Sequence, residues 1–237
     1  MLLIKRIMNW VFEMLTHILC RIDARELAKM PSKGPLIVVA NHINFLEVPV
    51  LFTQVMPRRV SGYAKAEHFD RWITRTLFTI WEAVPIRRGE ADVHAIRGAL
   101  KKLEEGLIFG IAPEGTRTGD GRLIRGHPGI VVLALRSGAP LQPVVFWGHE
   151  NYQQDWKRLR RAPFIIRVGR MFTLDPGEER VDGEIRQKMT DEIMYQLAAL
   201  LPEQNRGVYT DLDSATTDYL RFIDSEDGST SHGESNA

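Results

Sequence analysis

Two short segments of the chain hold residue types that could move a proton and grip an anion. In the first, Asn41-His42-Ile43-Asn44-Phe45-Leu46-Glu47, a histidine stands five positions before a carboxylate. A neutral imidazole takes a proton from an alcohol only when its other nitrogen is kept as N–H, which a carboxylate acceptor achieves. His42 and Glu47 are therefore a candidate general base and its orienting group. The alternative is that His42 caps a helix on which Glu47 is solvated.

The second segment, Pro113-Glu114-Gly115-Thr116-Arg117, has the residue types of a phosphate-binding turn. Gly115 permits a positive φ or a close backbone approach, and Arg117 presents a guanidinium fork that matches a phosphate. Thr116 adds a hydroxyl donor. Glu114 would repel phosphate, so we expect it to orient a guanidinium or to bind a substrate hydroxyl. The alternative is a surface turn closed by its own Glu–Arg pair.

Each of these segments follows a short apolar run that is typical of a buried strand. Residues 36–40 lead into His42, and residues 107–112 lead into the second segment. Ligands of open α/β sheets bind beyond the carboxyl ends of the strands, so both segments are well placed for a site. Arg88 follows a third such run at 83–86 and is a candidate second cation at the same edge.

The alternation of strands and helices predicts an α/β fold, a single domain with a central mixed β-sheet flanked by helices. Further strands are expected at 143–147 and 164–168, and helices at about 91–105 and 183–201. A chain of 237 residues accommodates one such domain, which we place at residues 26–202. Beyond it the composition becomes polar, so residues 203–237 are expected to form a disordered tail.

Composition and charge narrow the class of protein. The formal net charge is +1, which argues against a nucleic-acid partner, since such proteins usually carry a concentrated basic excess. The single cysteine excludes an internal disulfide and a cysteine-based zinc cluster. We therefore expect an ordinary globular protein in a reducing compartment.

Residues 1–25 are predicted to form a membrane-associating amphipathic helix. They hold many large apolar side chains but no uninterrupted apolar run near the ~20 residues of a bilayer span. On a helical wheel the polar residues occupy about a third of the circumference; they are Lys5, Arg6, Asn9, Glu13, Thr16 and His17. Such a helix suits the plane of a membrane, with its cations near anionic headgroups and Trp10 at the interface. The alternatives are a helix docked on its own domain and a dimer contact.

Four blocks, taken in order, resemble the PlsC-type glycerolipid acyltransferases, whose best-known members are the lysophosphatidic acid acyltransferases. The family's Asn-His-x4-Asp block corresponds to residues 41–47, and its second block, which ends in an arginine, to 83–88. Its Pro-Glu-Gly-Thr-Arg block is intact at 113–117, and its proline-bounded strand corresponds to 140–146. The chain departs from the family's usual residues at Glu47 (aspartate), Asn44 (serine) and Glu82 (glycine).

The resemblance implies an O-acyltransferase that moves a fatty acyl group from a thioester, acyl-CoA or acyl carrier protein, to a hydroxyl of a glycerolipid. The favoured acceptor is 1-acylglycerol-3-phosphate, which would give phosphatidic acid. His42 would deprotonate the hydroxyl for direct attack, without an acyl-enzyme, and Glu47 would orient His42. The acceptor's phosphate and glycerol would lie against Arg88, Glu114, Gly115, Thr116 and Arg117. No metal or cofactor is implied, and the N-terminal helix would hold the enzyme peripherally at the cytoplasmic face of the membrane.

Two other functions are compatible with the same residues. The fold could acylate another lipid alcohol, such as a lyso-ornithine lipid or a glycolipid, although an intact phosphate-binding block favours a phosphorylated acceptor. The chain could also be a peripheral membrane protein that binds lipid without catalysis, which only Glu47 in place of aspartate supports. Since glutamate keeps the charge, the pattern predicts that Glu47→Asp keeps or raises activity and that Glu47→Ala cripples it. The basic run 157–161 could meet a carrier's phosphates or simply be solvated.

Overall fold

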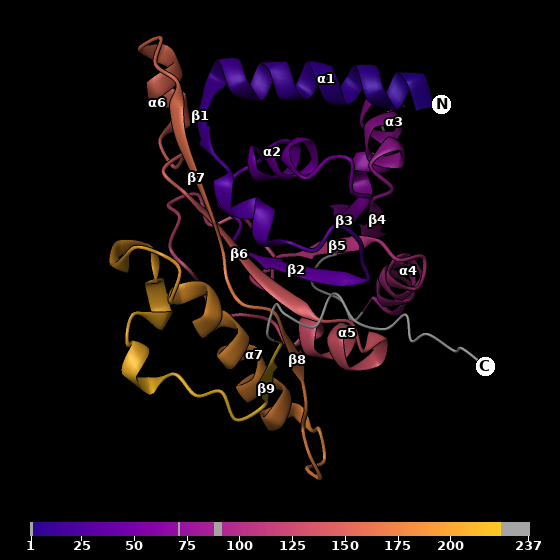
Figure 1. Ribbon diagram of the computed structural model, residues 1–237, viewed down its shortest axis with the longest axis vertical. Coiled ribbons are helices and arrows are strands. Elements are labelled where there is room, and N and C mark those ends of the chain that lie inside the picture. The colour runs from indigo at the N-terminus through magenta and orange to yellow at the C-terminus, as the bar shows by residue number, and fades with distance from the viewer. Residues whose placement is uncertain (1, 71, 88–91, 224–237) are drawn as a thin grey trace, which may run out of the picture.

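A mixed β-sheet forms the middle layer of the protein, and helices cover both of its faces (Figure 1). The computed structural model describes residues 2–70, 72–87 and 92–223. Within these ranges the strands are β1 (Cys20–Asp23), β2 (Leu36–Ala40), β3 (Val60–Lys65), β4 (Val84–Ile86), β5 (Ile108–Ile111), β6 (Leu141–Trp147), β7 (Ala162–Val168), β8 (Phe172–Leu174) and β9 (Leu220–Phe222).

Both parallel and antiparallel pairs build the sheet, whose main order is β1-β7-β6-β2-β5-β3-β4. Strand β2 runs parallel to β5 and to β6, and the parallel pairing continues through β3 to β4. Strands β7 and β8 run antiparallel to β6, and β9 extends the sheet beyond β8. The predicted central mixed sheet is confirmed.

Strand β2 lies at the centre of the sheet and is buried along its whole length. Its side chains alternate, so that Ile37 and Val39 enter the core on one face while Leu36 and Val38 enter the core on the other. A strand covered on both faces needs a continuous apolar run rather than an alternating one. That requirement explains why the strand at 36–40 was predictable from sequence.

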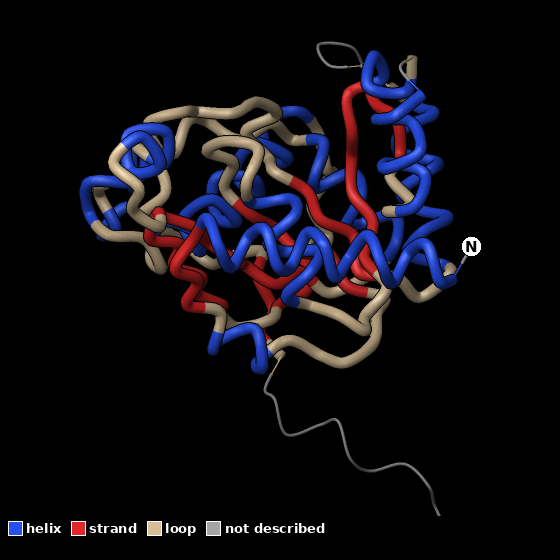
Figure 2. The backbone as a smooth tube through the Cα atoms, turned by 90° about the horizontal axis from the view of Figure 1, so that it is seen from above, coloured by secondary structure: helices blue, strands red, loops and turns tan. Residues whose placement is uncertain are grey.

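Helices α4, α5 and α7 pack on one face of the sheet, and α2 packs on the other, with α1 lying across α2 (Figures 1 and 2). Asp92 and Asp182 cap α4 and α7, because their carboxylates accept hydrogen bonds from the first-turn N–H groups of Ala95 and Ile185. The α-helices of the described residues are α1 (Leu2–Leu19), α2 (Glu47–Gln54), α3 (Trp72–Ile80), α4 (Val93–Glu104), α5 (Gly129–Ser137), α6 (Tyr152–Lys157) and α7 (Gly183–Ala198).

Helix α1 docks on the domain through part of its polar stripe and turns an apolar face outward. Asn9 and Thr16 are buried, and Asn9 Nδ2 donates to the Met56 sulfur at 3.4 Å. The outward apolar side chains are 41–62% exposed; they are Ile7, Trp10, Met14, Leu15 and Ile18. None of the described helices combines the length and the apolarity that crossing a membrane requires.

The aromatic stretch at 67–81 divides between core and surface. Trp72, at the start of α3, is 78% exposed, whereas Trp81 is buried directly after that helix. The Trp81 ring lies 5.2 Å from the ring of Phe12 on α1 and 5.1 Å from that of Phe52 on α2. Trp81 therefore joins three helices on this side of the molecule.

Residues 203–223 fold onto the domain, which corrects the expectation that a disordered tail begins at residue 203. Three short 3-10 helices precede β9, and Tyr209 and Leu220 enter the hydrophobic core to which α5 and α7 also contribute. The remaining part of that predicted tail, 224–237, lies outside the described residues. The domain thus continues to at least residue 223.

A buried carboxylate explains how a polar segment becomes ordered. Glu192 on α7 is 2% exposed and accepts hydrogen bonds from Thr216 Oγ1 at 2.6 Å, from Asp218 N at 2.7 Å and from Tyr219 N at 3.0 Å. An unpaired buried carboxylate is energetically costly, so Glu192 requires these three donors. In accepting their hydrogen bonds, it holds residues 216–219 in place. The polar composition of residues 203–237 does not reveal that a single buried carboxylate binds part of this segment to the domain.

Candidate functional site

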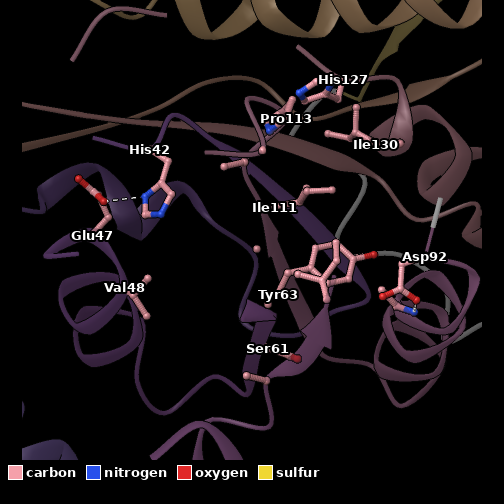
Figure 3. A pocket seen from close by; sticks show the side chains of 18 of the residues that line it. His42, Glu47, Val48, Ser61, Tyr63, Asp92, Ile111, Pro113, His127 and Ile130 are labelled. Atoms are coloured by element: carbon pink, nitrogen blue, oxygen red, sulfur yellow. Dashed lines mark hydrogen bonds and ion pairs between the residues drawn. The ribbon is translucent and has the colours of Figure 1, made fainter. Parts of the chain in front are cut away.

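His42 stands just beyond the carboxyl end of β2, where its parallel neighbours β5 and β6 also end. The preceding residue, Asn41, fixes this position by pairing its amide with the backbone of β6. Asn41 Nδ2 donates to Phe146 O at 2.9 Å, and Asn41 Oδ1 accepts from Phe146 N at 2.8 Å. The chain therefore leaves β2 in a defined direction that brings His42 to the cavity wall (Figure 3).

Glu47, the first residue of α2, holds the imidazole as the sequence predicts. Glu47 Oε2 lies 2.9 Å from His42 Nδ1, and the backbone N–H of Asn44 donates to the same carboxylate at 2.9 Å. Burial acts to raise the pKa of Glu47, but hydrogen bonds from His149 and His42 outweigh it and hold that pKa below its ordinary value. An ionised Glu47 keeps the hydrogen on Nδ1 of His42 and leaves Nε2 able to accept a proton.

A second histidine, His149, binds the other oxygen of the same carboxylate and was not singled out from the sequence. Its Nε2 lies 2.5 Å from Glu47 Oε1, and its side chain is fully buried. A signal was present, because His149 lies two positions after the end of β6, a parallel neighbour of β2. Parallel neighbours end at one edge of a sheet, so His149 and His42 had to lie close together.

The two motifs of the sequence meet in one site. Thr118 N donates to His42 O at 2.9 Å, and Gly119 N donates to Ile43 O at 3.0 Å. These backbone hydrogen bonds join the loop after β2 to the loop after β5. The turn at 113–117 is thereby placed beside the predicted base, as the position of both motifs after neighbouring strands indicates.

Glu114 turns into the protein rather than toward a substrate. Its carboxylate is buried and accepts hydrogen bonds from His42 N at 2.8 Å and from Ile124 N at 3.3 Å. In this position Glu114 ties the loop of the base to its own loop. The structure therefore places it away from the role of orienting a guanidinium or binding a substrate hydroxyl.

Pro113 is buried like Glu114, whereas the last three residues of this turn are exposed. Gly115 has a φ of +66°, and a Cβ built there would lie 3.0 Å from the His127 ring, so both backbone conformation and space favour glycine. Thr116 and Arg117 are exposed beside it. Among the described residues Arg117 makes no hydrogen bond or ion pair, so its guanidinium is available to an anion.

The second block of the family pattern is described only up to Arg87. Arg88, the predicted second cation, lies outside the described residues. Glu82, which replaces the usual glycine, adopts a φ of +55° that glycine would take without strain. Its carboxylate forms ion pairs with Arg59 at 2.7 Å and with Lys102 at 3.2 Å, which help to retain that backbone shape.

A cavity of about 660 Å³ opens beside His42 and is lined mainly by apolar side chains (Figure 3). Its size lies within the range of about 300–1,000 Å³ that is usual for small-molecule sites. His42 and Gly115 contribute to one part of the wall, and Tyr63 and Asp92 to another. Its largest apolar lining residues come from α2, α3 and the adjoining strands and loops; they include Leu51, Phe52, Phe78, Trp81 and Ile111.

A mixed α/β sheet with the predicted base His42 and the predicted phosphate-binding turn at its carboxyl edge is the arrangement that the resemblance to the acyltransferases implies. Comparison with known families agrees, because the family model described as Acyltransferase matches residues 21–147. The chain belongs to the Acyltransferase family. The match includes β2, β5 and β6 and both sequence motifs.

Curated relatives carry one activity in their names. The chain is 29% identical over 130 residues to the 1-acyl-sn-glycerol-3-phosphate acyltransferase of Bacillus subtilis (strain 168), covering 54% of this chain and 64% of that protein. It is 29% identical over 140 residues to the enzyme of that name from Limnanthes alba, covering 57% and 50% respectively. The match thus spans about half to two thirds of these relatives' own length.

The fold also has a counterpart among solved structures. The crystal structure of the 1-acyl-sn-glycerophosphate acyltransferase PlsC from Thermotoga maritima superposes with a TM-score of 0.59 and 21% sequence identity. The superposition covers 83% of this chain and 78% of that one. At this identity the likeness establishes a common fold.

Glu114 makes the stability of the protein depend on pH. Burial raises its pKa from 4.5 to about 7, against the two backbone hydrogen bonds, and the charges of Glu47 and Asp120 add to the rise. The folded state therefore binds a proton that the unfolded state has lost between these pH values. The contribution is complete below pH 4.5 and disappears as pH rises through about 7.

We expect Glu114→Gln to remove this dependence. Between pH 4.5 and 7.5 the unfolding free energy of the wild type should fall, relative to that of the variant, by on the order of 3 kcal/mol. Urea denaturation at a series of pH values measures the difference. Glu104→Gln, at an exposed glutamate on α4, is the control. Parallel curves for wild type and Glu114→Gln would contradict the expectation.

Proposed function

We propose that this protein is an O-acyltransferase that transfers a fatty acyl group from a thioester to a hydroxyl of a glycerolipid, with His42 as the general base. The observation that carries the proposal is the placement of His42: Glu47 holds its Nδ1, and its ring lines a largely apolar cavity. A positioned base that opens onto such a cavity, together with the Arg117 guanidinium, which pairs with nothing in the described ranges, meets the needs of acyl transfer to a phosphorylated lipid alcohol.

The proposed reaction is a direct transfer. His42 Nε2 takes the proton of the acceptor hydroxyl while the hydroxyl oxygen attacks the thioester carbonyl carbon. The resulting tetrahedral oxyanion collapses as the C–S bond breaks, and the thiolate receives the proton from the His42 imidazolium. The products are an ester and a free thiol. No acyl-enzyme forms; the only cysteine of the sequence, Cys20, is buried, and burial raises the pKa of its thiol to about 11.

The substrates follow from the surroundings of the base. The apolar side chains of the cavity suit a fatty acyl chain, and Arg117 with Thr116 and Gly115 suits the phosphate of an acceptor. The names of the curated relatives support 1-acylglycerol-3-phosphate as that acceptor, with phosphatidic acid as the product. The donor would be acyl-CoA or acyl carrier protein. This route uses the residues of the chain alone, without a metal or cofactor.

Purified protein supplied with an acyl-CoA and lysophosphatidic acid should release free thiol, which a thiol reagent detects. His42→Ala should lower the rate by about 10²- to 10⁴-fold, the usual contribution of a general base. His94→Ala, at an exposed histidine on α4, should leave the rate unchanged.

Parallel assays with acyl carrier protein, a lyso-ornithine lipid and a glycolipid identify the donor and the acceptor. Turnover confined to an acceptor without phosphate would overturn the proposed acceptor but keep the proposed chemistry. If no acceptor is acylated, or if His42→Ala matches the wild type, the acyltransferase proposal fails.

Arg117→Ala should raise the KM for lysophosphatidic acid by roughly 10- to 100-fold, which corresponds to a charged hydrogen bond lost from a phosphate. The KM for the thioester should change little, and Arg117→Lys should recover only part of the loss because it keeps the charge without the fork. Arg136→Ala, at an exposed arginine near the end of α5, is the matched control. An unchanged KM in Arg117→Ala would remove this residue from the acceptor site.

The same proposal places the outward face of α1 on the cytoplasmic surface of a membrane. The exposed apolar side chains of this helix form a stripe that includes Trp10, Met14 and Ile18. A basic turn at 157–161 lies beside the end of the helix, because Trp156 Nε1 donates to Leu19 O at 2.9 Å (Figure 1). Apolar residues flanked by cations are the usual composition of a helix lying in the plane of an anionic bilayer.

The triple variant Trp10→Ser, Met14→Ser and Ile18→Ser should bind liposomes containing anionic phospholipid roughly tenfold or more weakly than the wild type, since each change removes apolar area from the stripe. Co-sedimentation measures this binding. Val208→Ser changes an apolar residue that is 65% exposed in the C-terminal segment and should have no effect. Equal co-sedimentation of the triple variant and the wild type would rule out this face as the anchor.

A further inference from the structure

His149 contacts both residues at which the segment 41–47 departs from the usual family pattern. Asn44, in place of serine, donates from Nδ2 to His149 O at 3.2 Å. Glu47, in place of aspartate, accepts from His149 Nε2 at 2.5 Å. The first contact goes to the backbone of His149 and the second to its side chain, so the loop after β2 is joined at two points to the residue that follows β6.

The ring of His149 is held firmly and in one tautomer. The side chain is 0% exposed, and its ring stacks on Phe164 with centroids 4.1 Å apart. Its Nδ1 is buried without a hydrogen-bond partner in the described structure, whereas Nε2 faces the Glu47 carboxylate. A hydrogen on Nδ1 would find no acceptor, so the hydrogen belongs on Nε2, where Glu47 accepts it.

The length of Glu47 allows its carboxylate to serve two imidazoles at once. Oε2 faces His42 and Oε1 faces His149, while Asn44 N donates to both oxygens at 3.2 and 2.9 Å. Aspartate is one methylene shorter, and its carboxylate would withdraw toward the start of α2. It could then keep one histidine or the other but not both at hydrogen-bond distance.

We infer that His149 is a positioning residue of the base: its Nε2–H fixes the Glu47 carboxylate, which in turn keeps the hydrogen on His42 Nδ1 and turns His42 Nε2 toward the acceptor hydroxyl. The inference rests on the proposed acyl transfer and deepens it. It also reverses the expectation drawn from the sequence for Glu47→Asp, which should now lower activity instead of keeping or raising it.

Two amide substitutions separate this role from simple packing. His149→Gln keeps an N–H donor near the position of Nε2, whereas His149→Asn carries the same amide one methylene short of Glu47. We expect His149→Asn to lower kcat by about ten- to a hundredfold, part of the contribution of a general base, with little change in the KM of either substrate. His149→Gln should stay within about threefold of the wild type, which corresponds to less than one ordinary hydrogen bond.

The pH profile supplies a second readout. Without the donor of His149, the Glu47 carboxylate is no longer fixed against His42 Nδ1 and stabilises the His42 imidazolium less. The acid limb of the kcat profile should therefore move to lower pH in His149→Asn and stay in place in His149→Gln. Glu114, which bonds to His42 N, and His127, which lines the same cavity, are unchanged in both variants. Ile166→Val, a buried change in β7, should lower Tm without moving the limb.

A double-mutant cycle tests whether His149 acts through Glu47. Glu47→Asp and His149→Asn should each lower kcat. The double variant should be no slower than the slower single variant, because both changes disrupt the same network of hydrogen bonds at the Glu47 carboxylate. Effects that multiply would overturn the inference, as would a His149→Asn variant with the kcat and acid limb of the wild type.

Imidazole nitrogen NMR distinguishes failure of the inference from failure of the proposed function. In the wild type, His42 should carry its hydrogen on Nδ1, and in His149→Asn it should sample both tautomers. If the wild type acylates no acceptor but the tautomers behave in this way, the proposed function falls and the positioning stands. If acyl transfer is observed but the His42 tautomer is the same in both proteins, the positioning falls and the function stands.

Discussion

The site depends on one buried carboxylate that several donors share. Glu47 is 3% exposed, and an isolated charge at such a position would be strongly unfavourable. Two imidazoles and a backbone N–H surround it, so that the charge is kept and the orientation of His42 follows from it. The fold therefore has to deliver His42, Glu47 and His149 to one point. It does so by ending β2 and β6, two parallel neighbours, at the same edge.

The loop after β5 completes this arrangement with a second buried carboxylate. Glu114 bonds to the backbone of His42, and further backbone hydrogen bonds join the two loops. Glu47 is ionised and orients a side chain, whereas Glu114, with its raised pKa, fixes backbone. Only the exposed part of that loop, with Arg117 at its end, is left to meet an anion. Residue type does not separate the side chains that support the site from those that can contact a substrate. Their burial and their hydrogen-bond partners do.

The sequence was informative wherever a pattern is continuous or a motif follows a strand. The buried run at 36–40, the positions of His42 and the 113–117 turn, and their meeting at one edge all follow from strand rules. His149 lies outside every motif, and only its place after β6 connects it with His42. The sequence predicts that Glu114 orients a guanidinium or binds a substrate hydroxyl, whereas the structure buries it. Its burial depends on the conformation of the loop, which no short sequence pattern encodes. Glu192 similarly orders a polar segment through three specific donors, which an average over composition cannot show.

The contact between α1 and Trp81 gives the N-terminal helix a part in the shape of the cavity. Trp81 packs on Phe12 of α1, and its indole N–H donates to Asn9 Oδ1 at 3.5 Å. Trp81 also lines the cavity beside His42. The helix is thus one layer behind a substrate wall rather than a detachable tether. Removing it would expose the back of that wall to solvent, so a truncated chain would lose more than attachment: the cavity would no longer have the same walls.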